Sequence, residues 1–145
     1  MAKQRPVTLK EQLQAVGLRG TKPRLALAVF LERRHQPVGT PELAGELVPK
    51  RFDLATLYRT LKSFQDAGLV RHVPIDQRFA SYEWVQDAEE HHHHLVCQTC
   101  GVIEEIPECD LEALEKRVLK GARGFSRITS HSLEFFGVCS ACSKH

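Results

Sequence analysis

The chain has 145 residues, enough for one ordinary domain or two small ones. Hydrophobic residues make up 42% of the sequence and charged residues 26%, a globular composition that excludes a disordered chain. No apolar run approaches the roughly 20 residues of a membrane helix, and the start MAKQRPVTLK lacks the apolar core of a signal peptide. We therefore expect a cytoplasmic protein with no membrane partner, whose five cysteines stay reduced and serve as metal ligands or core residues.

The net charge of +2 hides an uneven distribution along the chain. Residues 1–84 contain 14 Lys and Arg against 8 Asp and Glu, whereas residues 85–145 contain 6 against 10. All five cysteines lie in the second part, together with five histidines besides the terminal His145. A basic part suggests a polyanion as partner, and an acidic part rich in thiols and imidazoles suggests metal.

Helices are predicted first along the basic part. One covers residues 8–16 and ends at Gly17, since apolar residues recur there at helical spacing. A second begins at Thr21, a plausible N-cap, and has Pro23 in its first turn, where the missing N–H costs little. A third begins at Thr40.

The fourth predicted helix is the most informative. It runs from Leu54 to Ala67, with Asp53 as its cap and Gly68 after its end. One face is apolar, and the opposite face is small, polar and basic: Ala55, Thr56, Arg59, Lys62 and Ser63. The alternative to a functional face is an amphipathic helix with an ordinary solvated side.

A β-hairpin is predicted after this helix. Residues 69–73 and 79–84 are strand-like and flank a turn at 74–78. Three or four short helices followed by a hairpin indicate a winged helix-turn-helix domain. Its fourth helix would enter the DNA major groove, with Arg59 as the best donor to a base edge or a phosphate.

A second, smaller domain is expected beyond a hinge at residues 87–90. The DNA-binding domain then spans residues 1–86 and the second domain residues 91–145, an α+β chain whose second domain is α/β. In the second domain we predict strands at 93–97, 102–106 and about 127–136, and a helix at about 110–120. A unit of this size has a small hydrophobic core. It usually needs a stabilising cross-link such as a bound metal, a partner chain, or both.

Two CxxC motifs indicate structural zinc in the second domain. They are Cys97-Gln-Thr-Cys100 and Cys139-Ser-Ala-Cys142. Two such turns close a tetrahedron of thiolates around the ion and leave no open position, so the site is structural. The alternative, a redox pair, normally occurs once and at a helix start.

An internal run of four histidines, residues 91–94, precedes the first CxxC motif. In an extended backbone, side chains alternate, so His91 and His93 face one way while His92 and His94 face the other. The run can therefore serve two metal sites, and histidine with carboxylate ligands suits Fe(II), Mn(II), Zn(II) or Co(II). The alternative is a solvated polar loop.

Several segments together resemble the ferric uptake regulator family. They are HHHHLVCQTCGVIEEI, TSHSLEFFGVC, CSAC, ATLYRTLKSFQDAGLV and GLRGTKPRLALAVF, and the resemblance extends from about Leu13 to Cys142. It implies a homodimeric, metal-activated transcriptional repressor, not an enzyme. Its N-terminal winged helix would bind an AT-rich inverted-repeat operator in double-stranded DNA, and its C-terminal α/β domain would dimerise and hold metal.

The resemblance also implies particular ligands. The structural zinc would be held by Cys97, Cys100, Cys139 and Cys142. The regulatory site between the domains would use Glu83, His92, His94 and Glu105. A further site would use His91, His93, Glu112 and His131. The expected DNA-binding residues are Arg19, Thr21, Arg24, Ala55, Thr56, Tyr58, Arg59 and Lys62, of which Tyr58 and Arg59 match the DNA-contacting part of the family's recognition helix.

The sequence departs from the family at one position. Many members have a regulatory histidine where this chain has Pro37, and His35 is the candidate substitute. Iron is the expected regulatory metal, followed by zinc and then manganese. Zinc sensors often carry a cysteine in the stretch corresponding to 76–90, and this chain has none there.

Two functions of other classes compete with a repressor. A zinc hydrolase would need an open metal position and a general base, and no HExxH motif is present. A metal-storage or chaperone protein would not need a basic winged helix.

Overall fold

The computed structural model describes residues 8–48, 50, 52–86, 92–107 and 110–144. The chain forms two compact units, Met1–Asp87 and Ala88–His145, each treated below by itself. The residues predicted to form the hinge, 87–90, lie outside the described residues. None of the helices in the described ranges is long and apolar enough to cross a bilayer.

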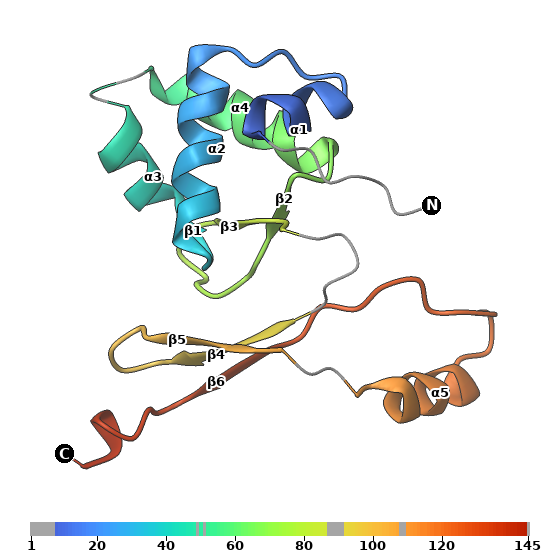
Figure 1. The fold of residues 1–145 in the computed structure, drawn as a ribbon. Helices are drawn as coiled ribbons and strands as arrows, with labels where there is room; N and C mark the ends of the chain where they lie inside the picture. The colour runs from blue at the N-terminus through green and yellow to red at the C-terminus, as the bar shows by residue number, and fades with distance from the viewer. Residues whose placement is uncertain (1–7, 49, 51, 87–91, 108–109, 145) are drawn as a thin grey trace. The chain divides into compact units, whose positions relative to one another are not determined.

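The first unit contains the four predicted helices (Figure 1). Their bounds are α1 Leu9–Ala15, α2 Lys22–Arg34, α3 Thr40–Leu47 and α4 Leu54–Asp66. The Thr8 hydroxyl caps α1 and accepts from the Glu11 N–H, whose own carboxylate accepts from Thr8. Asp53 caps α4 as predicted, because its Oδ1 accepts from the Thr56 N–H at 2.7 Å.

Helix α2 starts at its predicted cap but without the expected side-chain bond, whereas α3 starts at Thr40 as predicted. Thr21 is the N-cap of α2, but its side chain makes no capping hydrogen bond. Thr40 is the first residue within α3, and Gly39 is the cap. The ring of Phe79 lies 2.5 Å from where a Cβ at residue 39 would be, so a side chain there would displace the ring.

The predicted hairpin is present as part of a three-stranded sheet. Its strands are β2 Val70–His72 and β3 Ser81–Trp84, and the short β1 Val38–Gly39 adds to the other edge of β3. Both pairings are antiparallel, with Val70 opposite Trp84. The sequence prediction missed β1, because two residues carry no detectable alternation.

The core of the first unit joins the helices to this sheet. Helix α2 contacts β3, and α4 contacts β2. The Phe64 ring meets the Trp84 ring edge-on, with centroids 5.8 Å apart. Packing of this kind sets the orientation of α4 relative to the hairpin. The fully buried apolar side chains are Leu13, Leu27, Ala28, Leu31, Leu43, Leu57 and Phe64.

The second unit is a three-stranded sheet with one α-helix. Its elements are β4 His93–Cys97, β5 Ile103–Ile106, α5 Glu112–Gly121, β6 Glu134–Gly137 and the 3₁₀ turn Cys142–Lys144. The strand order is β5-β4-β6, with β5 antiparallel and β6 parallel to β4.

The prediction of a strand at about 127–136 is wrong for the first part of that range. Only residues 134–137 form β6, and they pair with His94 to Cys97 of β4. Strand β4 begins at His93, so in this register the residues before Leu133 have no strand residue beside them in the described sheet.

Much of the apolar surface of this unit is exposed. Phe125 is 76% exposed, Val118 on α5 53% and Phe136 on β6 48%. None of the described residues of α5 is buried. A unit with so little core is the kind that gains stability from a metal and a partner.

Candidate metal centres and nucleic-acid interface

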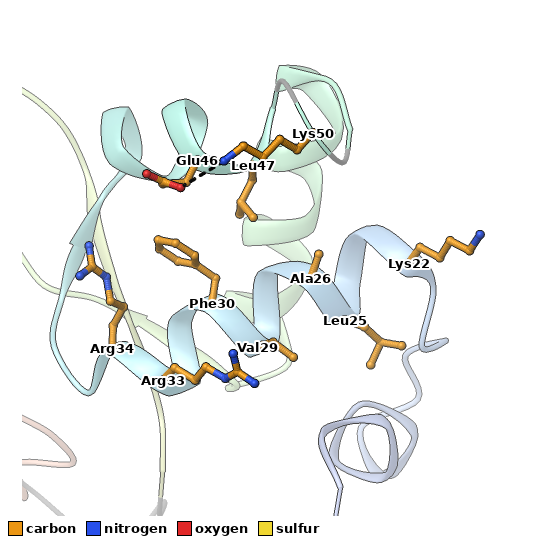
Figure 2. Close-up of a pocket in the computed structure, with 10 residues that line it drawn as sticks. All are labelled: Lys22, Leu25, Ala26, Val29, Phe30, Arg33, Arg34, Glu46, Leu47 and Lys50. Atoms are coloured by element: carbon orange, nitrogen blue, oxygen red, sulfur yellow. Dashed lines mark ion pairs between the residues drawn. The ribbon is translucent and has the colours of Figure 1, made fainter.

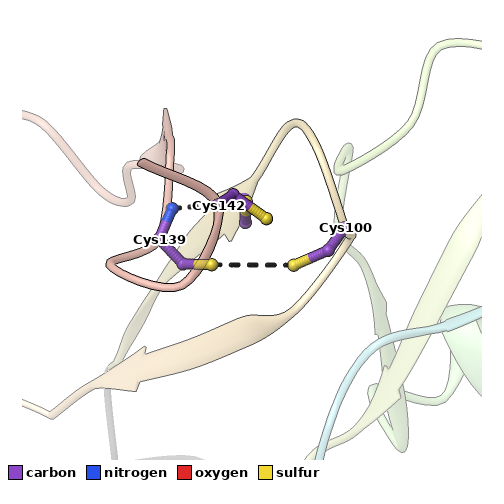
Figure 3. A group of neighbouring side chains, drawn as sticks. Cys100, Cys139 and Cys142 are labelled. Atoms are coloured by element: carbon purple, nitrogen blue, oxygen red, sulfur yellow. Dashed lines mark hydrogen bonds between the residues drawn. The ribbon is translucent and has the colours of Figure 1, made fainter. Parts of the chain in front are cut away.

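Four cysteines of the second unit converge, and Figure 3 labels three of them, Cys100, Cys139 and Cys142. Cys97 ends β4, Cys100 follows in the adjoining turn, and Cys139 and Cys142 come after β6. The four sulfur atoms all lie within 4.8 Å of one another, and those of Cys100 and Cys139 are 3.7 Å apart. A tetrahedron with Zn–S bonds of about 2.3 Å has edges of about 3.8 Å, so the arrangement suits zinc.

Local backbone geometry builds this cluster. The Gly101 N–H donates to the Cys97 carbonyl at 2.9 Å, and Gly101 has a φ of 76°, which closes the first turn. The Cys139 N–H donates to the Cys97 sulfur at 3.3 Å and connects the second turn to the first.

The thiols have unequal acidities. The N–H of Cys139, followed by that of Cys100, lowers the pKa of Cys97 to about 6. Contact first with the Cys139 thiol and then with that of Cys100 raises the pKa of Cys142 to about 12. Four adjacent thiolates need a cation to offset their repulsion, and a divalent ion supplies that charge.

The histidine run is split by strand alternation as predicted. The rings of His92 and His94 are 5.1 Å apart, whereas the ring of His93 lies 5.3 Å from that of His131. The fourth histidine, His91, lies outside the described residues.

Glu105 joins the first of these pairs. It lies opposite His94 in the β4–β5 ladder, and its Oε1 is 3.6 Å from Nδ1 of His92. His94 is buried and Glu105 is half exposed. The sheet thus gathers three of the four predicted regulatory ligands, two imidazoles and one carboxylate.

The fourth predicted regulatory ligand, Glu83, belongs to β3 of the first unit, and its side chain is buried. The Arg71 guanidinium donates two hydrogen bonds to its Oε2, at 2.9 and 2.7 Å. Pro37 is buried, and the exposed His35 ends α2 in a left-handed conformation with a φ of 50°. Nδ1 of His35 lies 2.7 Å from Nε2 of Gln86.

The second pair of histidines has a carboxylate partner that the sequence did not indicate. Nδ1 of His131 lies 2.7 Å from Oε1 of Glu115, whereas the predicted Glu112 pairs with Lys116 at 3.1 Å. Nδ1 of His93 donates to the Leu133 carbonyl at 2.9 Å. Glu112 and Glu115 are three residues apart on one helix face, so sequence spacing does not distinguish them.

The predicted DNA-binding residues gather on one side of the first unit. A depression of about 430 Å³ between the start of α2 and α4 is lined by five of them: Arg19, Thr21, Arg24, Thr56 and Arg59. Nη1 of Arg24 donates to the Arg19 carbonyl at 3.1 Å, and Nη2 of Arg59 donates to the Thr56 hydroxyl at 3.1 Å. These bonds hold cationic side chains over an open surface.

The other three lie along α4. Ala55 is exposed, and so is Tyr58, at 50%. Lys62 is exposed and pairs with Asp66 at 2.7 Å. Five of the eight predicted residues therefore line one depression that contains arginines and hydroxyl groups, and the other three lie on α4, which borders it.

A larger groove, of about 940 Å³, lies between α2 and α3 (Figure 2). Phe30 projects into it, and the Arg34 guanidinium lies 5.4 Å from the centre of that ring. Arg34 pairs with Glu42, and Lys50 with Glu46. None of the predicted metal or DNA residues lines this groove, so it is separate from those sites.

Comparisons with known proteins agree with this arrangement. A model of the ferric uptake regulator family matches residues 15–136. The ferric uptake regulation protein of Legionella pneumophila is 33% identical over 135 residues, which cover 91% of this chain and 96% of that protein.

Two solved structures agree in fold as well. The Vibrio cholerae ferric uptake regulator has a TM-score of 0.69 and 31% identity, covering 91% of this chain and 100% of that one. A zinc-bound manganese uptake regulator has a TM-score of 0.66 and 33% identity, covering 91% and 98%.

The chain therefore belongs to the ferric uptake regulator family of metal-responsive, DNA-binding transcription regulators, which are dimeric and are not enzymes. This confirms the resemblance found in the sequence and the α+β class, a winged helix followed by a dimerisation domain. The hydrolase and storage alternatives are set aside.

Proposed function

We propose that this regulator is an Fe(II)-responsive repressor, which binds an AT-rich inverted-repeat operator as a homodimer when its regulatory site is filled. The observation that carries the proposal is the grouping of His92, His94 and Glu105 on one sheet. They form a histidine and carboxylate donor set in a chain that also has a cationic recognition helix.

The regulatory ligands come from both units. Glu83 lies on β3, the second strand of the β2–β3 hairpin, which is the wing. His92, His94 and Glu105 lie beyond residues 87–90. A divalent ion supplies the positive charge that lets two carboxylates and two imidazoles converge. The converged ligands hold each winged helix in one orientation, so the two recognition helices of a dimer reach successive major grooves about 34 Å apart.

DNA affinity then depends on how often the competent orientation is populated. Without the fourth ligand connecting the units, each winged helix samples other orientations, and binding must first select the competent one. A related observation supports this mechanism: the structure of the Vibrio cholerae regulator reveals a structural rearrangement of its DNA-binding domains.

The donor set favours iron. The proposed ligands include no cysteine, and imidazole with carboxylate suits Fe(II). The similar manganese uptake regulator is a zinc-bound structure, so zinc and manganese are the alternatives that the experiment must include. The four cysteines hold a separate, structural zinc ion in this proposal, and His91, His93, His131 and a glutamate of α5, Glu112 or Glu115, form a further site.

The dimer is proposed to form through the second unit. This unit exposes large apolar side chains on α5 and β6, including Val118, Phe135 and Phe136. A second copy of the chain would cover such a surface.

The test starts from protein that retains only the structural zinc. Its affinity for an AT-rich inverted repeat and for random DNA is measured by band shift in buffered Fe(II), Mn(II) and Zn(II), at two salt concentrations. We expect Fe(II) to raise affinity for the inverted repeat at least tenfold. Equal affinity with and without every metal would contradict a metal-dependent repressor, and a response to Zn(II) or Mn(II) alone would contradict the choice of iron.

A further inference from the structure

A partly buried ion pair, in which Glu83 is buried and the Arg71 side chain is 33% exposed, fixes the position of the Glu83 carboxylate. The side chain of Glu83 is 4% exposed, and both hydrogen bonds from Arg71 end on its Oε2. Arg71 and Glu83 face each other directly in the β2–β3 ladder. The pairing is therefore set by the strand register and does not depend on a flexible loop.

This pair differs from the other arginine–carboxylate pair of the wing. Arg78 pairs with Asp76 on the surface, and the Arg78 side chain is 79% exposed. An exposed pair contributes little to stability, whereas a buried carboxylate that loses its partner is strongly destabilising. Arg71 therefore supplies positive charge that stabilises the buried Glu83 carboxylate.

We propose that Arg71 competes with the regulatory metal for Glu83 and thereby sets the metal affinity of the sensor. The inference rests on the proposed function, because it requires Glu83 to be a metal ligand. Arg71 is a cation that Glu83 contacts directly. When Glu83 also contacts a divalent ion, the guanidinium and the ion share one carboxylate and repel each other.

The charge balance gives the direction of the effect. The proposed ligands Glu83 and Glu105 carry two negative charges, which match a divalent ion. Arg71 adds a third positive charge, 2.7 Å from a ligand oxygen. Its removal should therefore strengthen metal binding, and the protein without the regulatory metal should lose stability because a buried carboxylate loses its guanidinium partner.

The experiment measures Co(II) affinity by calorimetry in protein that retains only the structural zinc. Arg71→Met removes the charge, and we expect Co(II) to bind at least tenfold more tightly than in the parent protein. Co(II) should also raise the melting temperature of this variant by more than it raises that of the parent. Arg71→Gln removes the charge but can still donate to Glu83, and it replaces the methionine variant if that variant does not fold.

Three comparisons decide the outcome. Arg78→Met removes the exposed arginine of the same hairpin and should leave Co(II) affinity unchanged, and Arg71→Lys, which keeps the charge, should stay close to the parent. Unchanged or weaker Co(II) binding in Arg71→Met and Arg71→Gln would overturn the inference, since Arg71 would then only position Glu83. Glu83→Gln separates the two proposals: if it leaves Co(II) affinity unchanged, Glu83 is no ligand and the proposed regulatory site itself fails.

Discussion

Arg59 is an exposed cationic side chain on α4 and the predicted donor to DNA from that helix. Its guanidinium donates to the Thr56 hydroxyl on the previous turn, which holds it beside Arg19 and Arg24 over the same depression. Arginine in such a position donates either to a guanine edge or to a phosphate.

Truncation of Arg59 separates these two roles. If Arg59 reads a base edge, Arg59→Ala should weaken binding to the inverted repeat by about 1–3 kcal/mol and leave binding to random DNA nearly unchanged. Fluorescence anisotropy with both DNAs measures this. An equal loss on both sequences, with a lower salt dependence, would show that Arg59 contacts only phosphate.

Individual residues could be predicted from the sequence where local rules decide their placement. Strand alternation places His92 with His94 and His93 with His131, because the period of two holds in any extended segment. Arg71 opposite Glu83 could not be predicted, since a long connection between β2 and β3 does not determine their register.

At the scale of elements, the second unit depends on the two cysteine turns. The first turn follows β4 and the second follows β6, so the cluster joins the ends of two parallel strands. The apolar residues of α5 are not buried, so core packing adds little to what the cluster supplies. Zinc-binding free energy is then largely folding free energy for this unit.

Cys97→Ser should therefore release about one zinc ion per chain and weaken the dimer. Elemental analysis gives the zinc content, and analytical ultracentrifugation gives the oligomeric state. Cys109→Ser is the matched control, since Cys109 is the one cysteine outside the two CxxC motifs, and it should keep both properties. A Cys97→Ser protein that is still dimeric with unchanged zinc would contradict a structural zinc site at the four cysteines.

Helices were predicted more closely than strands, and the reason is physical. Asp53 caps α4 through a bond to a residue three positions away, so the signal is contained in the local sequence. The extent of β6 instead depends on its pairing with His94–Cys97 of β4, and that of β1 on its pairing with β3. Where these strands begin and end depends on residues distant in sequence, so the local sequence pattern does not predict it.

At the scale of the whole molecule, the two units of this regulator differ in chemistry. The first unit presents the basic side chains of α4, and the second gathers thiols, imidazoles and exposed apolar side chains. The sequence indicates the same division, because its first part is basic and its second part is acidic. The orientation of one unit against the other is what the proposed regulatory ligands control.

Two neighbouring histidines of β4 provide the most direct test of this central claim. His93 and His94 are both buried, at 4% and 3% exposure, but His94 groups with His92 whereas His93 groups with His131. The measurement is the affinity for the inverted repeat as buffered Fe(II) increases, in His94→Ala and in His93→Ala. The account predicts that His94→Ala, like His92→Ala, loses the metal-stimulated increase while it keeps its zinc and its dimer, and that His93→Ala retains most of the increase. If His93→Ala proves as damaging as His94→Ala, or if His94→Ala still responds to Fe(II) like the parent protein, the assignment of the regulatory site is contradicted.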